Sequence, residues 1–86
     1  MYDIIFSDLA KNQFSKLEKD IQNRIGKILE RIRIRPFHFI KRVVGDPYFR
    51  LRVGDYRVLI DIRQDKLIIF VIEMGHRKKF LEIILK

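Results

Sequence analysis

Three arginines in a short stretch of the chain have the spacing to bind one phosphate together. Arg50 and Arg52 are two residues apart, and Gly54-Asp55 separates them from Arg57. Gly-Asp between two alternating runs predicts a two-residue hairpin turn, which would place Arg52 opposite Arg57. Because successive side chains of a strand point to opposite faces, all three guanidinium groups would share one face. The sequence therefore predicts a cationic cluster on one face of a hairpin.

Placing Arg52 opposite Arg57 costs free energy, because like charges directly opposite one another destabilise a sheet. Two guanidinium groups about 7 Å apart repel by roughly 0.6 kcal/mol in water and by about 2.4 kcal/mol at an effective dielectric near 20. A polyanion reverses the sign of that term by bringing a phosphate to each arginine. One such arginine alone has a structural interpretation, since its stem can lie along an apolar surface. Three on one face favour an anion site.

An arginine cluster suits the cleavage of RNA without a metal ion. In that reaction the ribose 2′-hydroxyl attacks the adjacent phosphate, leaving a 2′,3′-cyclic phosphate and a 5′-hydroxyl. Negative charge gathers on the nonbridging oxygens in the transition state, where arginine forks stabilise it. Arginine itself stays protonated, with a pKa above about 12, so another group must move the protons.

His76 is the candidate for proton transfer. An imidazole, with an ordinary pKa of about 6.5, suits general acid or base chemistry near neutral pH. The same histidine could equally be a structural turn residue that donates to a backbone carbonyl. Tyr56 is a weaker candidate, as is His38 in a basic loop. Two histidines without cysteines or paired carboxylates disfavour a metal site, so we expect no cofactor.

The hairpin belongs to a predicted single α+β domain covering residues 1–86. Residues 2–6 predict a first strand, and Ser7 suits the N-cap of the helix that follows. A second helix comes next, with Asp20 as a possible cap and Pro36 just beyond its end. The apolar stripes of the two helices are Ala10, Phe14, Leu17 and Ile21, and then Ile21, Ile25, Ile28, Leu29 and Ile32.

The two helices are expected to form an antiparallel hairpin that packs on a sheet. Gly26 lies in the middle of the second helix, at a cost of about 1 kcal/mol against alanine. A glycine there would let the helices approach closely. Residues 37–47 are expected to be irregular and basic.

Three C-terminal strands, at residues 48–53, 56–63 and 66–74, predict an antiparallel meander. If the turn at Gln64-Asp65 has two residues, Arg57 faces Ile72. The chain ends with helical spacing at Phe80, Ile83 and Ile84, which predicts a short C-terminal helix. That helix would pack on the sheet or offer a docking surface.

The composition favours a basic protein that binds nucleic acid. The chain has 19 lysines and arginines against 11 aspartates and glutamates, a net charge of +8 and a pI near 10.1. A basic face without a partner, or a ribosomal-protein-like or DNA-binding role, would look similar at this level. We expect no disulfide, no membrane span and a cytoplasmic location. The second-helix cations form a solvated face or a footprint for ribosomal RNA: Arg24, Lys27, Arg31, Arg33 and Arg35.

The order strand, helix, helix and three-strand meander resembles the RelE/ParE superfamily of toxin–antitoxin toxins over nearly the whole chain. The most specific pieces are the run from Arg50 to Val58, with Gly54-Asp55-Tyr56-Arg57 at its centre, and Gly75-His76-Arg77 one strand later. Within that superfamily the chain looks most like RelE, the branch that cleaves messenger RNA in the ribosomal A site.

The resemblance implies a role for each basic residue. Arg50 and Arg52 occupy strand positions where that branch places basic catalytic groups. Arg57 matches the phosphate-binding arginine after the tyrosine, and Arg77 matches the arginine after the final strand, which stabilises the transition state. Several RelE-type enzymes also carry a catalytic tyrosine near the C-terminus. Here that stretch holds Leu81, Ile83, Ile84 and Leu85, so either the chemistry runs without the tyrosine or this member is slower or altered.

By this resemblance the chain would be a toxin and a ribosome-dependent, metal-independent messenger RNA endoribonuclease. Its partners would be the ribosome, messenger RNA and an acidic or amphipathic RelB-like antitoxin that covers the arginines. Two alternatives stay open. One is a ParE-like inhibitor of gyrase without nuclease activity, and the other is a basic nucleic-acid-binding module that leaves its ligand intact.

Overall fold

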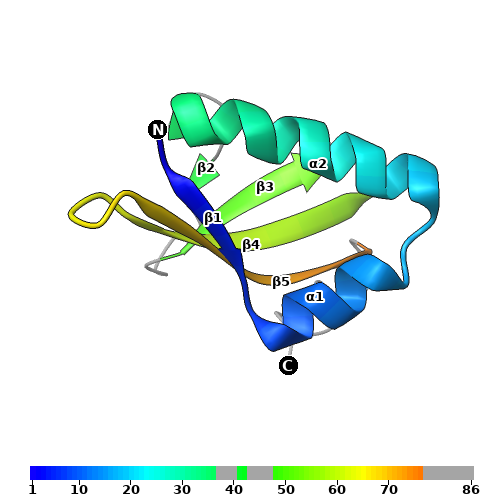
Figure 1. Ribbon diagram of the computed structural model, residues 1–86. Helices are drawn as coiled ribbons and strands as arrows, with labels where there is room; N and C mark the ends of the chain where they lie inside the picture. Colours follow the sequence, from blue (N-terminus) through cyan, green and yellow to red (C-terminus); the bar gives the residue numbers. More distant parts are fainter. Residues whose placement is uncertain (37–40, 43–47, 77–86) are drawn as a thin grey trace.

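The computed structural model describes residues 1–36, 41–42 and 48–76. In these residues two helices pack against one mixed five-stranded sheet with strand order β1-β5-β4-β3-β2 (Figure 1). The elements are β1 (Asp3–Phe6), α1 (Asp8–Ser15), α2 (Lys19–Ile34), β2 (Lys41–Arg42), β3 (Phe49–Val53), β4 (Tyr56–Arg63) and β5 (Ile68–His76). The predicted α+β class is confirmed. The expected helix at Phe80, Ile83 and Ile84 lies outside the described residues.

The C-terminal meander forms as predicted, but the sheet is not antiparallel throughout. Strands β3, β4 and β5 pair antiparallel, whereas β1 pairs parallel to β5. The pattern of a strand specifies which face is buried but not which strand lies beside it. Strand β2 was also missed, because two residues are too few to show alternation. It pairs with β3 in the register Lys41 to Arg50.

The helix ends follow the capping rules only at α1. Ser7 is its N-cap, and the hydroxyl accepts a hydrogen bond from the Ala10 N–H at 3.0 Å. At α2 the predicted cap is wrong: Glu18 occupies the N-cap position without a side-chain hydrogen bond, and Asp20 lies in the first turn. The first-turn carboxylate still complements the helix dipole. Helix α2 ends at Ile34, before Pro36, as predicted.

The core lies between the helices and one face of the sheet. Its residues alternate along each strand, since a strand exposes every second side chain to the same face. Burial of this set supplies most of the favourable free energy of folding. The buried set, exposed by 4% or less, is Ala10, Ile25, Leu29, Ile32, Leu51, Val53, Val58, Ile60, Ile69, Val71 and Met74.

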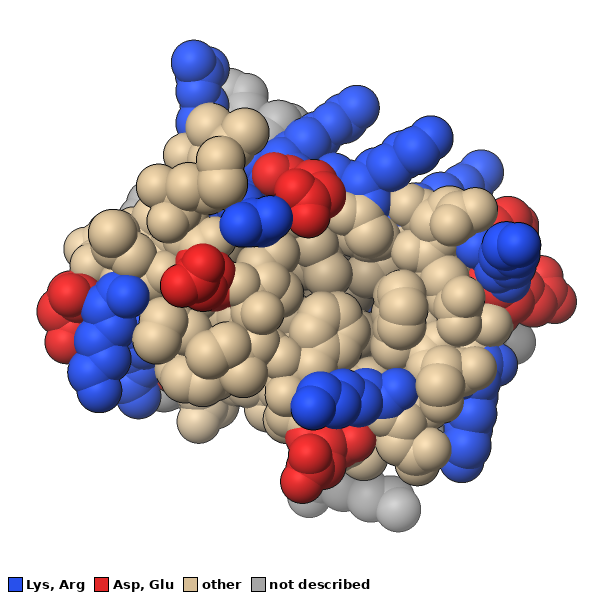
Figure 2. All heavy atoms as spheres, viewed as in Figure 1, with Lys and Arg blue, Asp and Glu red and all other residues tan. Residues whose placement is uncertain are grey.

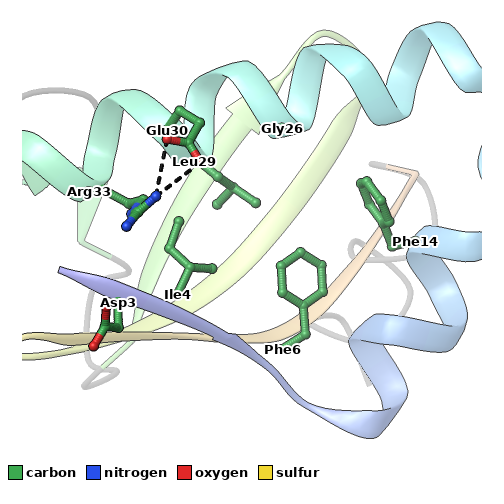
Figure 3. A pocket seen from close by; sticks show the side chains of 8 residues that line it. All are labelled: Asp3, Ile4, Phe6, Phe14, Gly26, Leu29, Glu30 and Arg33. Carbon is green, nitrogen blue, oxygen red and sulfur yellow. Dashed lines mark hydrogen bonds and ion pairs between the residues drawn. The ribbon is translucent and has the colours of Figure 1, made fainter.

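A groove opens between the two helices, where close approach was expected. Helices α1 and α2 diverge from their connection (Figure 1), and a cavity of about 570 Å³ lies between them and β1 (Figure 3). A Cβ built on Gly26 would find no atom within 4 Å, so the glycine faces this open space. The prediction that Gly26 allows tight helix packing is wrong, because the helices contact the sheet and not one another at this level.

The turn between β4 and β5 is longer than predicted. It spans residues 64–67, and Leu67 adopts a positive φ of 53°. Together with a bulge in β5, the longer turn pairs Arg57 with Gly75 and not with Ile72. The turn was expected at Gln64-Asp65 alone, and nothing in a leucine signals positive φ.

A bulge in β5 adds a further shift to this register. The pairing steps from Leu59 opposite Glu73 to Ile60 opposite Val71, which leaves Ile72 as the extra residue. Helix α1 holds the bulge from the core side. The Ser7 hydroxyl donates to the Ile72 carbonyl at 2.6 Å, and the Gln13 amide oxygen accepts from the Met74 N–H at 2.8 Å.

Candidate functional site

The predicted hairpin is confirmed and has the turn that its glycine allows. Gly54 adopts a φ of 58°, whereas Asp55 does not adopt a positive φ. Positive φ at the first central residue alone is the pattern of a type II′ turn, which matches the twist of the flanking strands. Arg52 pairs directly with Arg57, as predicted.

The three arginines share the sheet face opposite the helices, and we call this set the arginine face: Arg50, Arg52 and Arg57. The intervening Leu51 is 1% exposed on the helix-covered face, so its neighbours point the other way. Arg52 is exposed, and the other two arginines are half-buried. In a two-residue hairpin the second pair from the turn is the one without backbone hydrogen bonds, where side chains lie closest. The strands thus set two like charges side by side.

The Arg57 side chain folds back over the turn. Its Nη1 donates to the Gly54 carbonyl at 3.4 Å and to the Tyr56 carbonyl at 3.2 Å. These bonds use one nitrogen of the guanidinium fork. A guanidinium fork carries five donors in a geometry that matches phosphate.

Carboxylates do not neutralise the two arginines of β3. Among the described residues, neither Arg50 nor Arg52 lies within 4.0 Å of an aspartate or glutamate oxygen. The ion pair on this side of β4 is at its far end, where Arg63 Nε lies 3.0 Å from Asp61 Oδ2. Strand β3 therefore presents two arginines that no described carboxylate neutralises at close range, as an anion site requires.

The structure does not bring His76 onto the arginine face. His76 pairs in register with Tyr56, and the two rings meet edge to face with centroids 5.5 Å apart. Tyr56 lies two residues before the buried Val58, and His76 lies two residues after the buried Met74. Side chains two residues apart in a strand share a face, so the contact lies on the helix-covered side. Arg77 and His38 lie outside the described residues.

Sequence reasoning placed Arg24 in a solvated face or a ribosomal RNA footprint of the second helix, and did not link it to the hairpin turn that it approaches in the fold. A Cβ built on Gly54 would have the Arg24 Nη1 as its nearest neighbour, at 3.7 Å. Gly54 follows Arg24 by thirty positions in the sequence, and only the packing of α2 on the sheet brings them together. No local pattern could have signalled this contact.

Two further features bear on what the site can hold. In the described ranges, no three His, Cys, Asp or Glu side chains are grouped so as to bind a metal ion. Neither of the two described helices has the length and apolar character needed to cross a bilayer.

A family model matches most of the chain. The model described as "ParE toxin of type II toxin-antitoxin system, parDE" aligns with residues 4–79. No curated protein matches the chain at a significant level of sequence similarity.

Solved structures of RelE toxins share the fold. The toxin of the intact E. coli RelBE complex superposes with a TM-score of 0.79 at 21% identity, covering 88% of this chain and 96% of that chain. The isolated E. coli RelE toxin gives 0.80 at 19% identity, over 99% and 97% of the two chains. The RelB-RelE complex of Methanococcus jannaschii gives 0.75 at 25% identity, over 92% and 96%.

Proposed function

Since the chain belongs to the ParE toxin family of type II toxin–antitoxin systems, and so to the RelE/ParE superfamily, we propose that it is a ribosome-dependent endoribonuclease that cleaves messenger RNA in the A site. The observation that carries this proposal is the arginine face. Arg52 lies directly opposite Arg57, with Arg50 on the same face, and the two β3 arginines have no carboxylate partner among the described residues. A fold selected for stability alone gains nothing from that arrangement.

The arginine face would act on the charge of the reaction. The ribose 2′-oxygen attacks the adjacent phosphorus, the bond from phosphorus to the 5′-oxygen breaks, and a 2′,3′-cyclic phosphate forms. The 2′-hydroxyl loses its proton, and the 5′-oxygen gains one. Guanidinium donors held on β3 and β4 stabilise the charge on the nonbridging oxygens with no further reorganisation.

We assign Arg52 and Arg57 to the scissile phosphate. Arg50 lies on the same face of β3, two residues before Arg52. The resemblance assigns Arg77 to the same task. The imidazole of His76 packs against Tyr56 on the helix-covered side, so the proposal rests on charge stabilisation and not on proton transfer by His76. If His76 does move a proton, His76→Gln will change the pH profile of the cleavage rate. If it only packs on Tyr56, the profile keeps its shape.

A protein antitoxin is part of the proposal. The E. coli and M. jannaschii structures are complexes of RelE with RelB. We expect this chain to bind an acidic or amphipathic RelB-like protein that covers the arginine face. Charge masking of this kind weakens as salt rises, so the affinity for the antitoxin should fall with ionic strength.

Inhibition of DNA gyrase is the second candidate, because the matching family model is that of ParE. The two functions give different products. Incubation of the purified chain with programmed ribosomes, followed by mapping of the 5′ ends of the message, should reveal A-site cuts with 5′-hydroxyl termini. Intact messages, together with loss of supercoiling by gyrase, would instead establish the ParE-like reading.

A further inference from the structure

The polar flank of α2 carries a second cationic surface, which we call the α2 basic stripe: Arg24, Lys27 and Arg31. All three side chains are exposed. At 3.6 residues per turn and 1.5 Å per residue, they lie within an arc of about 60° and extend about 10 Å along the helix axis. Figure 2 shows lysine and arginine side chains projecting outward above α2, while the centre of that view is largely uncharged.

The α2 basic stripe is not neutralised within the fold. In the described parts of the chain its three side chains form no hydrogen bond and no ion pair. The Glu30 carboxylate lies beside the stripe but is paired with Arg33, 3.2 Å from its Nη1. Arg33 has a structural task of its own, since its Nε donates to the Tyr2 carbonyl at 3.0 Å. Asp20 shares the arc one turn before Arg24 but lies beyond 4.0 Å of it.

The α2 basic stripe meets the arginine face at Gly54. Arg24 Nη1 approaches this residue from α2, at 3.7 Å from the position of a Cβ. Arg57 Nη1 approaches from β4, at 3.4 Å from the Gly54 carbonyl oxygen. Two guanidinium groups from remote parts of the sequence therefore lie near the same residue. The α2 basic stripe and the arginine face therefore present charge of the same sign on the two sides of the hairpin turn.

We propose that the α2 basic stripe binds the sugar–phosphate backbone of RNA, as a continuation of the phosphate site around the hairpin turn. The choice of RNA over DNA rests on the proposed function. Three exposed cations in a row, with no aromatic side chain among them, suit contacts to successive phosphates, which position a nucleic acid without reading its sequence. An acidic protein segment would be expected to use apolar contacts as well, and the stripe offers none.

The test compares two triple variants with the same loss of charge. Arg24→Gln, Lys27→Gln and Arg31→Gln together remove the stripe and keep good helix formers. The control is Lys11→Gln, Lys16→Gln and Lys66→Gln, which removes three exposed lysines from α1, its C-cap and the β4–β5 turn. The probe is a fluorescent single-stranded RNA with 2′-O-methyl groups on every ribose, which cannot undergo 2′-oxygen attack. Binding is measured by anisotropy over a range of salt concentrations.

The stripe variant should lose affinity at low salt, and its slope of log K against log salt should be less negative by about 2, because each phosphate contact to a single strand contributes about 0.7. Arg24→Gln alone should change the slope by about 0.7. The control triple should leave the slope close to that of the parent. Equal effects of the two triple variants on RNA binding would overturn the proposal. So would a stripe variant that binds RNA like the parent but no longer binds poly-glutamate, an acidic polypeptide measured as a second probe. Thermal unfolding of each variant verifies the fold.

The readouts separate this inference from the proposed function. Binding of the uncleavable RNA does not depend on nuclease activity. If the salt slope depends on the stripe but messages stay intact on programmed ribosomes, the proposed nuclease function is wrong and the RNA-binding surface is supported. If A-site cuts occur but the stripe variant binds RNA like the parent, the nuclease function is supported and the RNA-binding surface is wrong. On ribosomes without a message, weaker binding of the stripe variant would identify ribosomal RNA as the source of the backbone, whereas weaker binding only with a message would identify the message.

Discussion

The two faces of the sheet are built from alternate residues of the same strands, and they have opposite physical properties. On the helix-covered face, Leu51, Val58 and Ile60 are exposed by 1% or less. On the arginine face, Arg52 and Arg57 lie opposite each other in register. One face gains free energy on folding by burial, whereas the other sets two like charges opposite each other, which disfavours folding. A step of one residue along β3 or β4 therefore changes which property a substitution tests.

The largest expected effect is on the helix-covered face. Ile60→Ala removes a fully buried side chain and should lower the free energy of unfolding by about 2 to 5 kcal/mol, through lost burial and the cavity that remains. Leu59→Ala, one residue away on the half-buried arginine side, is the control, with an expected loss of about 1 kcal/mol. Urea denaturation measures both. Equal losses would show that the two faces do not differ as described.

The next effect concerns the bulge in β5, which sets the side of the sheet to which each β5 side chain points. Gln13→Ala removes the acceptor of the Met74 N–H and should cost about 1 to 3 kcal/mol, because a partly buried donor loses its partner. Hydrogen exchange should show faster exchange at the Met74 amide. Asn12→Ala, at the exposed neighbouring position, should leave that amide protected. Unchanged exchange in Gln13→Ala would mean that α1 does not hold the bulge.

A smaller effect, of opposite sign, is expected on the arginine face. Arg52→Gln removes one of two facing like charges and should raise the free energy of unfolding by about 0.5 to 2 kcal/mol at low salt. The gain should shrink in high salt, since the charge is exposed to screening. Urea denaturation at two ionic strengths tests this. A loss of stability would show that Arg52 supports the fold.

The smallest effect lies at the turn between β4 and β5, which belongs to neither face. Leu67→Gly relieves a positive φ and should raise the free energy of unfolding by about 0.5 kcal/mol, because the relief is partly offset by the entropy of the unfolded chain. Lys66→Gly, at a neighbouring position without positive φ, should lower it. Thermal unfolding distinguishes the two. A loss in both variants would mean that Leu67 packing outweighs its backbone strain.

The part of the site that the sequence predicted is the part that local rules determine. A two-residue Gly54-Asp55 turn fixes the pairing of β3 with β4, and the period of two then places the arginines. The same reasoning failed one turn later. A four-residue turn with Leu67 at positive φ has no composition signal, and the hydrogen bond from the Met74 N–H beside the bulge goes to Gln13 in the remote helix α1.

Contacts between remote elements account for the other differences. Nothing near Arg24 in the sequence points to Gly54, and nothing near Gly26 shows that it faces a groove. The parallel pairing of β1 with β5 and the two-residue strand β2 are likewise set by tertiary packing. The roles of Arg50, Arg52, Arg57, Arg77 and His76 stay predictions.

The most direct test of the account is the single-turnover rate of message cleavage on programmed ribosomes for Arg57→Ala against Arg63→Ala. Both arginines lie on β4 and on the same side of the sheet, but Arg63 is at the far end and pairs with Asp61. We expect Arg57→Ala to lose about 10² to 10³ in rate, the usual cost of one preorganised donor, and Arg63→Ala to cleave like the parent. Equal rates for the two variants would contradict the central claim that the arginine face stabilises the transition state.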